Sequence, residues 1–289
     1  MQNEERLEVR LLGEVDIAAA VRLKELAVWN QTEDDWRRLL RLEPNGCFCA
    51  TVGGRVVGTA TTTTYGRDLA WIGMVLVDPD YRRLGIATRL MHAALDYLHA
   101  AGVVAVKLDA TEDGRPLYEN LGFKEESLVE RWTGVADARD SDCQTMNPSA
   151  IKSAISEALT FDRHAFVADR SKLIEMLAQD FYVPPLVARS PDDRLTGYAL
   201  TRRGTAAAYI GPLVATAPEA ATSLVDGMCN QLVGQQIYID LNTDFETGRE
   251  VLTARGFVKQ RDLIRMSYGE TSVAGTSPSI FAIAGPEYG

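Results

Sequence analysis

The chain has 289 residues, 46% hydrophobic and 24% charged, so it is long enough for about two globular domains. Its 30 basic and 40 acidic residues give a net charge of −10, which argues against a nucleic-acid or anionic-membrane partner. The first ten residues carry several charges and no run of about 18 apolar residues occurs, so we expect no signal peptide. We therefore expect a cytoplasmic protein without a membrane-spanning helix.

The cysteines show neither metal-ligand nor disulfide spacing. Cys47 and Cys49 fall on one face of a probable strand, whereas Cys143 and Cys229 are isolated. We expect reduced thiols and no metal.

Residues 7–64 alternate between strand and helix patterns. The apolar residues Ile17, Ala20 and Leu23 recur at the spacing of one helix face. Thr32 and Asp35 form a capping box at the start of a second helix. We predict strands over 7–12, 47–51 and 55–64 and helices over 14–28 and 33–42, with a turn at Gly53-Gly54.

The stretch 70–101 organises the first half of the chain. An apolar strand over 70–77 is followed by a tight turn and a helix over 83–101, whose entrance has the form R-x-x-G-x-A at Arg82, Gly85 and Ala87. The unpaired N–H groups at the start of a helix, together with the positive end of the helix dipole, favour the binding of a phosphate. Because Gly85 has no Cβ, the phosphate can approach the backbone closely there. The entrance is neither a Walker loop nor a dinucleotide fingerprint.

The remainder of the first half predicts a strand over 103–109, a short helix over 115–121 and a strand over 123–134. A polar, small-residue stretch over 136–159 is the best candidate for a linker. The second half then repeats the first in outline: AYIGPLVATAPEAATSLVDGM parallels AWIGMVLVDPDYRRLGIATRLM. This copy lacks the arginines and the glycine, and Leu252 stands where the first has Tyr118. The apolar end FAIAGPEYG predicts a docked strand that completes the sheet or a pocket wall.

The entrance motif, the segment PLYENLGF at 116–123 and the order of elements together resemble the GNAT superfamily of N-acetyltransferases. With the second half, FDRHAFVADR at 161–170 and the apolar end, the chain resembles the YitH-like group, which carries an appended GNAT-like domain. The resemblance implies an α/β fold of two tandem domains, each with a mixed central sheet flanked by helices. We predict a catalytic domain at 1–135, a linker at 136–159 and a degenerate domain at 160–289.

The resemblance implies acetyl-CoA as co-substrate. Its diphosphate would lie on backbone N–H groups of 83–87, and its pantetheine arm along the end of the 70–77 strand. The cofactor-binding candidates are Leu76, Val77, Arg82, Arg83, Leu84, Gly85, Ile86, Ala87, Thr88 and Thr111. The Thr88 hydroxyl could instead bond back to its own helix, and Thr111 departs from the asparagine that is usual in the superfamily.

Tyr118 matches the tyrosine that protonates the leaving thiolate in many GNAT enzymes, although a tyrosine on a short helix can also simply pack. The base that deprotonates the amine is not identified: Asp109, Glu112 and Asp113 are candidates, and each can equally be a solvated loop charge.

The acceptor side is lined, by the same resemblance, by the loop Trp29-Asn30-Gln31, whose aromatic ring and amides suit a polar or cationic ligand. The same three residues could simply end a helix. The second domain is expected to close this cleft. Asp162 and Asp169 could then reach the acceptor, or pair on the surface; with Asp109 they complete the substrate candidates.

The sequence therefore predicts an acetyl-CoA-dependent N-acetyltransferase that acts on the primary amine of a small molecule in a ternary complex. Two alternatives remain: an acetyltransferase for protein lysines or N-termini, and a non-catalytic acyl-CoA-binding regulatory module. The expected partner is a small-molecule amine, and the chain is expected to be a monomer or a homodimer.

Overall fold

A computed structural model describes residues 6–139, 148–269 and 277–289, with the backbone alone for 148–152. The first half contains β1 Leu7–Leu11, η1 Glu14–Asp16, α1 Ile17–Leu26, α2 Glu33–Leu42, β2 Cys47–Val52, β3 Arg55–Tyr65, β4 Leu69–Val77, η2 Pro79–Tyr81, α3 Ile86–Ala100, β5 Ala105–Ala110, α4 Arg115–Asn120 and β6 Lys124–Val135. The second half contains α5 Pro148–Phe166, α6 Ser171–Gln179, β7 Leu186–Arg189, β8 Leu195–Arg202, β9 Ala208–Ala215, α7 Pro218–Gln231, β10 Gln236–Asn242, α8 Gly248–Thr253, β11 Val258–Gly269 and β12 Ile280–Ala282.

These elements confirm the predicted order and correct two helix boundaries. The helix predicted over 83–101 begins at Ile86, because Arg83 (φ 63°) and Gly85 (φ 75°) adopt left-handed backbone conformations that a right-handed helix excludes. The helix predicted over 14–28 opens as a 3₁₀ turn and ends at Leu26, ahead of Val28 at φ 55°. Helix α2 has its predicted bounds, and its capping box is present.

The predicted boundary between the halves stays a prediction. Helix α5 begins inside the predicted linker 136–159, and residues 140–147, with Cys143, lie outside the described residues. Cys47, Cys49 and Cys229 are buried free thiols. None of the described helices is long and apolar enough to cross a membrane.

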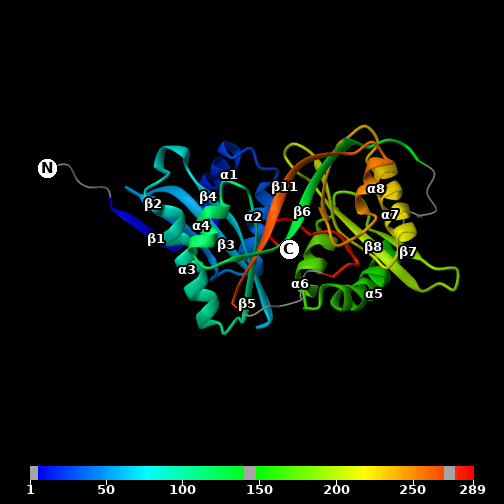
Figure 1. The fold of residues 1–289 in the computed structure, drawn as a ribbon, viewed down its shortest axis with the longest axis horizontal. Helices are drawn as coiled ribbons and strands as arrows, with labels where there is room; N and C mark the ends of the chain where they lie inside the picture. The colour runs from blue at the N-terminus through cyan, green and yellow to red at the C-terminus, as the bar shows by residue number, and fades with distance from the viewer. Residues whose placement is uncertain (1–5, 140–147, 270–276) are drawn as a thin grey trace.

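All twelve strands of the described chain form one mixed sheet, in the order β1-β2-β3-β4-β5-β11-β6-β10-β12-β9-β8-β7. Strand β11 of the second half lies between β5 and β6 of the first, antiparallel to both, and Figure 1 shows it beside β6. Strand β6 in turn pairs with β10 of the second half. The mixed α/β fold is confirmed, but the two expected central sheets are joined into one, because β6 of the first half and β11 of the second each lie in the other half's part of the sheet.

Two buried ion pairs cross between the halves where these strands meet. Arg265 on β11 lies opposite Asp109 on β5, with Nε–Oδ1 2.9 Å and Nη2–Oδ2 3.1 Å. Arg131 on β6 lies opposite Asp240 on β10, with both distances 2.7 Å. Each pair joins an arginine of one half to an aspartate of the other. Such bidentate pairs have a fixed geometry and so fix the register of the exchanged strands.

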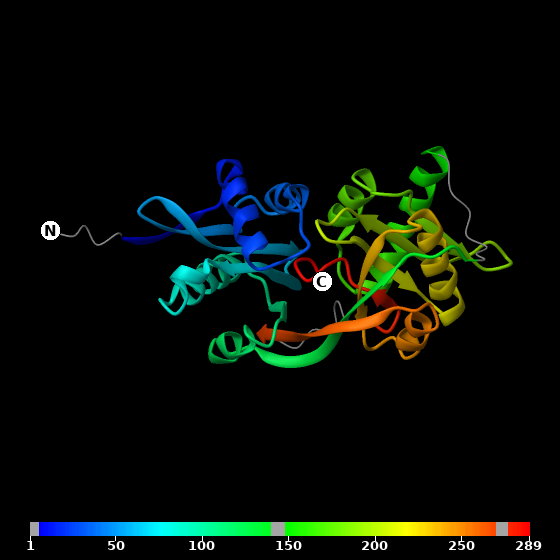
Figure 2. The ribbon, with the colours of Figure 1, turned by 90° about the horizontal axis from the view of Figure 1, so that it is seen from above.

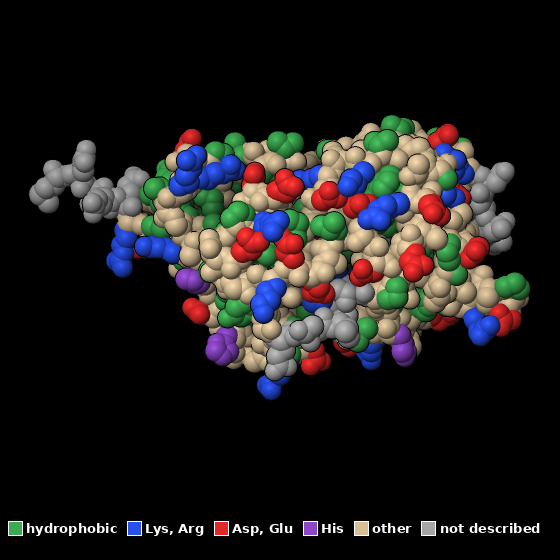
Figure 3. Space-filling model, in the orientation of Figure 1, with side chains coloured by type: hydrophobic (Ala, Val, Ile, Leu, Met, Phe, Trp, Pro, Cys, Tyr) green, Lys and Arg blue, Asp and Glu red, His purple; other side chains and the backbone are tan. Residues whose placement is uncertain are grey.

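Helices cover both faces of the sheet, as Figure 2 shows. On β4, Trp71 and Leu76 point into the core under α1 and α2, whereas Ala70 and Ile72 point into the core under α3 and α4. The first of these cores continues into the second half, where α5 and α6 contribute Phe166, Leu173, Ile174 and Leu177. The core under α7 and α8 is separate. On the face drawn in Figure 3, acidic and basic side chains are interspersed.

The halves differ where their parallel central strands separate. In the first half β4 pairs with β5 only at Ala70 and Trp71, and Met74 (φ 50°) lies at a bulge opposite β3 that bends β4 away. In the second half β9 and β10 also separate, but β12 fills the gap by pairing with both. This confirms the docked strand expected near the end of the sequence. Within the described part of the chain, the sheet stays open between its parallel central strands only in the first half.

One joined sheet predicts that both halves unfold together. We expect Phe281→Ala, which empties a fully buried position on β12, to lower the free energy of unfolding by about 3–5 kcal/mol. All four tryptophans lie at or before position 132. Their fluorescence should therefore report the loss in the same single urea transition as far-UV circular dichroism.

Val15→Ala, at a side chain that is 91% exposed, is the control and should change the free energy by less than about 0.5 kcal/mol. A tryptophan transition unmoved by Phe281→Ala would contradict the joined sheet.

Candidate active site

Two pockets meet in the opening between β4 and β5. The outer channel is wide and open to solvent, and it runs from the start of α3 to the loop after β5. The inner pocket is much smaller and continues toward the second half. Six residues line both and mark their junction: Trp29, Val75, Asp109, Thr111, Tyr118 and Arg261. A ligand lying in the channel can therefore meet a second ligand at this junction.

The start of α3 forms the outer end of the channel. Arg82, Arg83 and Gly85 to Thr88 line it, whereas the Leu84 side chain is 64% exposed and does not. The first helical hydrogen bond runs from the Arg89 N–H to the Gly85 oxygen (3.1 Å), and within the described residues the N–H groups of 84–88 donate to no protein acceptor. A Cβ on Gly85 would meet nothing within 4 Å, so this backbone is open to a ligand. Free N–H groups at a helix start are a geometry that suits an anion.

The channel wall continues along the end of β4. Leu76 and Val77 line it, and beyond Trp71 the edge of β4 that faces β5 has no strand partner among the described residues. The Arg82 Nε donates to the Val77 oxygen (3.3 Å), which holds the turn against the strand. An extended ligand can bond to this free edge as an added strand would.

Tyr118 on α4 lies at the junction of channel and pocket. Its side chain is 8% exposed and packs edge-on against Phe123, with ring centroids 6.1 Å apart. Burial raises the pKa of the Tyr118 phenol above its usual value. The hydroxyl therefore stays protonated at neutral pH and is available as a proton donor.

The three candidate bases differ in environment. The Asp109 carboxylate is fully buried in its pair with Arg265, and burial raises its pKa against the opposing charge of that arginine. Glu112 and Asp113 are exposed and line the outer channel. The Thr111 hydroxyl accepts from the Gly114 N–H (3.3 Å) at the start of α4. The structure gathers all of these at the junction or the channel but leaves Asp109 engaged in holding the sheet.

The predicted acceptor residues are only partly brought together. Trp29 lines both pockets and Gln31 lines the inner one. Asn30 lines neither, because its buried amide bonds to Ala206 and Ala207 across the interface between the halves. Its sequence neighbours reach the pocket while Asn30 itself joins the two halves.

Neither Asp162 nor Asp169 reaches the pockets. Asp162 is buried against Arg170 (2.8 and 2.9 Å) and Tyr198, so its charge is compensated inside the second half. Asp169 is exposed, pairs with Arg163 (2.7 Å) and accepts from the Ser171 N–H at the start of α6. Both carboxylates therefore stabilise the second half of the chain, and neither lines a pocket.

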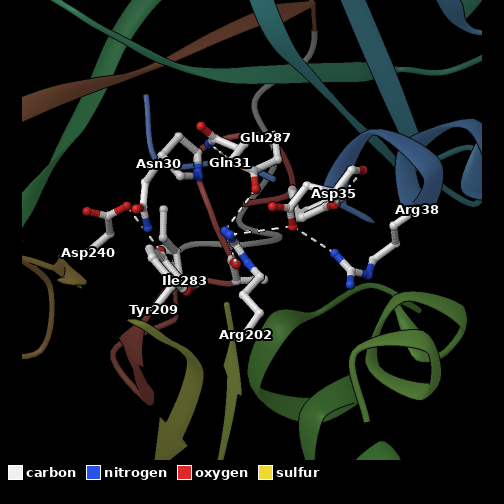
Figure 4. Close-up of polar contacts among 12 residues, drawn as sticks. Asn30, Gln31, Asp35, Arg38, Arg202, Tyr209, Asp240, Ile283 and Glu287 are labelled. Atoms are coloured by element: carbon white, nitrogen blue, oxygen red, sulfur yellow. Dashed lines mark hydrogen bonds and ion pairs between the residues drawn. The ribbon is translucent and has the colours of Figure 1, made fainter. Parts of the chain in front are cut away.

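The second half supplies pocket residues that the sequence patterns did not reveal, chiefly Arg261 on β11 and Glu287 after β12. Glu287 Oε1 accepts from Arg202 (2.8 Å) and its Oε2 accepts from Gln31 (2.8 Å), as Figure 4 shows. Burial raises the pKa of Glu287. The apolar end of the sequence pointed to this wall, but no local signal placed β11 in the first half.

Family models match both halves of the chain. Residues 18–123 match the acetyltransferase (GNAT) family, and residues 158–282 match a second acetyltransferase (GNAT) domain. Among the described residues no cluster of His, Cys, Asp or Glu is arranged to hold a metal ion.

Relatives and solved structures agree with this assignment. YitH of Bacillus subtilis, described as an uncharacterized N-acetyltransferase, is 26% identical, and the match covers 86% of each chain. The glucosamine 6-phosphate N-acetyltransferase of Trypanosoma brucei is 36% identical over 27% of this chain and 56% of its own. A crystal structure from Pyrococcus horikoshii superposes with a TM-score of 0.80 at 22% identity, covering 98% of this chain and 96% of its own. The similarity to the Pyrococcus horikoshii structure shows that both proteins have the same fold over the two halves of the chain.

The placement of the two aspartates gives a matched test. Asp162→Asn leaves Arg170 buried without its counter-charge, so we expect it to lower the free energy of unfolding by about 3–5 kcal/mol. Asp169→Asn changes an exposed pair and should cost less than about 1 kcal/mol. Urea denaturation of both variants measures the difference, and equal losses would contradict these placements.

Proposed function

Because the chain belongs to the GNAT acetyltransferase family, we propose that it transfers an acetyl group from acetyl-CoA to the primary amine of a small molecule. The observation that carries the proposal is the continuity of the site. An anion-binding helix start, a free strand edge and a protonated tyrosine line one channel in that order, and the channel ends where a second pocket begins. A thioester that carries a diphosphate at its far end needs an anion site, a strand edge and a proton donor in this spatial order.

The residues of the channel fit the cofactor. The N–H groups of 84–88 would hold the diphosphate, the edge of β4 at Leu76 and Val77 would bond the pantetheine arm, and Thr111 and Tyr118 would lie by the thioester. Donors fixed in a helix start need no rearrangement when the ligand binds. When bound, acetyl-CoA supplies an acetyl group already activated as a thioester.

The chemistry that remains for the protein is positioning and proton transfer. As the amine nitrogen bonds to the acetyl carbonyl carbon and the carbon–sulfur bond breaks, the Tyr118 hydroxyl would donate its proton to the leaving sulfur. The resulting phenolate would regain a proton from solvent. The nitrogen releases its own proton to water or to a carboxylate. General acid catalysis of this kind contributes about 10²–10⁴-fold.

Two features favour a small acceptor over a protein side chain. The inner pocket is walled by β11 and by Pro286 and Glu287, and it is much smaller than the outer channel. A small-molecule amine is also the acceptor named for the Trypanosoma brucei relative. Against a purely regulatory module stands Tyr118, which a binding protein would not need at the junction.

Gly85 tests the cofactor site. We expect Gly85→Ala to weaken acetyl-CoA binding at least about tenfold, because its Cβ would project into the anion corner. Gly66→Ala is the matched control: it has a similar backbone angle (φ 70° against 75°) and equally open surroundings but lies outside both pockets. Both variants should lose about 1–2 kcal/mol of stability.

Calorimetric titration with acetyl-CoA measures the affinities. Equal affinities for the Gly85 and Gly66 variants would remove the support for this cofactor site.

Tyr118 tests the chemistry. We expect Tyr118→Phe to lower kcat by about 10²–10⁴-fold and to change acetyl-CoA affinity less than about twofold, because the ring remains and only the proton donor is lost. Tyr268→Phe, at a ring that packs on Phe123 from outside the pockets, should leave kcat unchanged. The measurement is thiol release from acetyl-CoA with a panel of small amines. Retention of kcat in Tyr118→Phe would exclude the phenol as the proton donor.

A further inference from the structure

The inner pocket contains two buried polar atoms that the protein does not satisfy. Among the described residues, Gln31 Oε1 is a buried acceptor without a donor, and Arg261 Nε is a buried donor without an acceptor. Both side chains line this pocket. Native proteins leave few such atoms unpaired, because each costs its desolvation free energy. One missing donor and one missing acceptor in the same pocket point to a ligand that supplies both.

The acceptor end of the pocket suits an amine. The Gln31 Nε2 and Arg202 Nη2 atoms each donate to one oxygen of Glu287, which leaves lone pairs on the carboxylate beside the free Gln31 oxygen (Figure 4). This wall is held tightly: a Cβ on Gly73 of β4 would lie 2.6 Å from Glu287 Cα, so the segment crosses β4 where only a glycine leaves room. A carboxylate with an amide oxygen is a fitting receptor for N–H groups.

The donor end of the pocket suits an anion. Of the charged side chains that line it, Asp109, Arg131 and Glu287 are all paired with opposite charges. Arg261 has no acidic partner within the described part of the chain, and the neighbouring Asp262 pairs with Lys259 instead. Burial and the nearby charge of Arg131 lower the pKa of the Arg261 guanidinium. An anionic group on the ligand would give the Arg261 guanidinium both the opposite charge and the hydrogen-bond acceptor that it lacks among the described residues.

We propose that the acceptor is a short amine that carries an anionic group, with its nitrogen beside Glu287 and Gln31 and its anion on Arg261. The inference rests on the proposed acetyl transfer and deepens it. Arg261 and Tyr118 both line the junction of the two pockets, so a short ligand anchored on Arg261 keeps its nitrogen close enough to reach the thioester that would lie beside Tyr118. Simple amino carboxylates have this form, and aminoalkyl phosphates share its chemistry.

The test compares amines that differ by the anion alone. The full chain is assayed for thiol release from acetyl-CoA with β-alanine and propylamine, leucine and isopentylamine, and phosphoethanolamine and ethylamine. We expect the anionic member to have the higher kcat/KM, by about 10- to 100-fold, in at least one pair. The phosphate pair shows which anion is preferred.

Arg261→Met should bring the ratio of kcat/KM for the anionic and the neutral amine close to one. Arg249→Met, the matched loss of an arginine outside both pockets, should leave this ratio unchanged. Gln31→Met should lower kcat/KM for both members alike and leave the ratio unchanged. Thermal unfolding checks that each variant is folded.

Three results would overturn the proposal. In the first, the wild-type ratios are near one, so acetyl transfer stands without anion recognition. In the second, acetyl-CoA binds but no anionic amine is acetylated. In the third, Arg261→Met weakens acetyl-CoA binding tenfold or more, which assigns the guanidinium to the cofactor. A chain that binds no acetyl-CoA at all would instead refute the proposed function, and this proposal with it.

Discussion

Two crossed arginine–aspartate pairs are the constraint on which the rest of this structure depends. Arg265 of the second half binds Asp109 of the first, and Arg131 of the first binds Asp240 of the second. An unpaired charge at these buried positions would cost several kcal/mol, so β6 and β11 are held in each other's part of the sheet. This exchange carries Arg261, four residues before Arg265, to the junction of the two pockets. The same contacts therefore hold the fold and complete the site.

The two halves show how one fold yields either a binding site or a structural partner. Both separate their parallel central strands, but β12 fills the gap in the second half, where Leu241 and Leu213 both pair with Ala282. The first half keeps its gap, and the segment after β12 closes only the far side of it. The second half therefore lacks both the helix entrance motif and the space that a pantetheine arm would need.

The sequence predicted what is local and missed what depends on the meeting of distant strands. The capping box of α2, the turn at Gly53 and the glycine at the α3 entrance are set by neighbours in sequence, and the structure contains all of them. The predicted start of the third helix, at residue 83, lies three residues before the observed start of α3 at Ile86, because hydrophobic periodicity does not report the positive φ of Arg83. Asn30 and Asp162 have the residue types of a polar site, yet burial turns each into a structural hydrogen-bonding centre.

The two halves contribute different groups to the two pockets. The groups that fit the cofactor come from the first half, on α3, β4 and α4. The inner pocket takes polar groups from both halves, and the second half adds Arg261 and Glu287. Arg202 positions Glu287 and is itself held near Asp35 of the first half (3.6 Å). Under the proposed function, substitutions near Glu287 or on β11 would therefore change which acceptor is chosen without disturbing the helix start. The second half would then help to specify the acceptor, although its sequence lacks the cofactor motif.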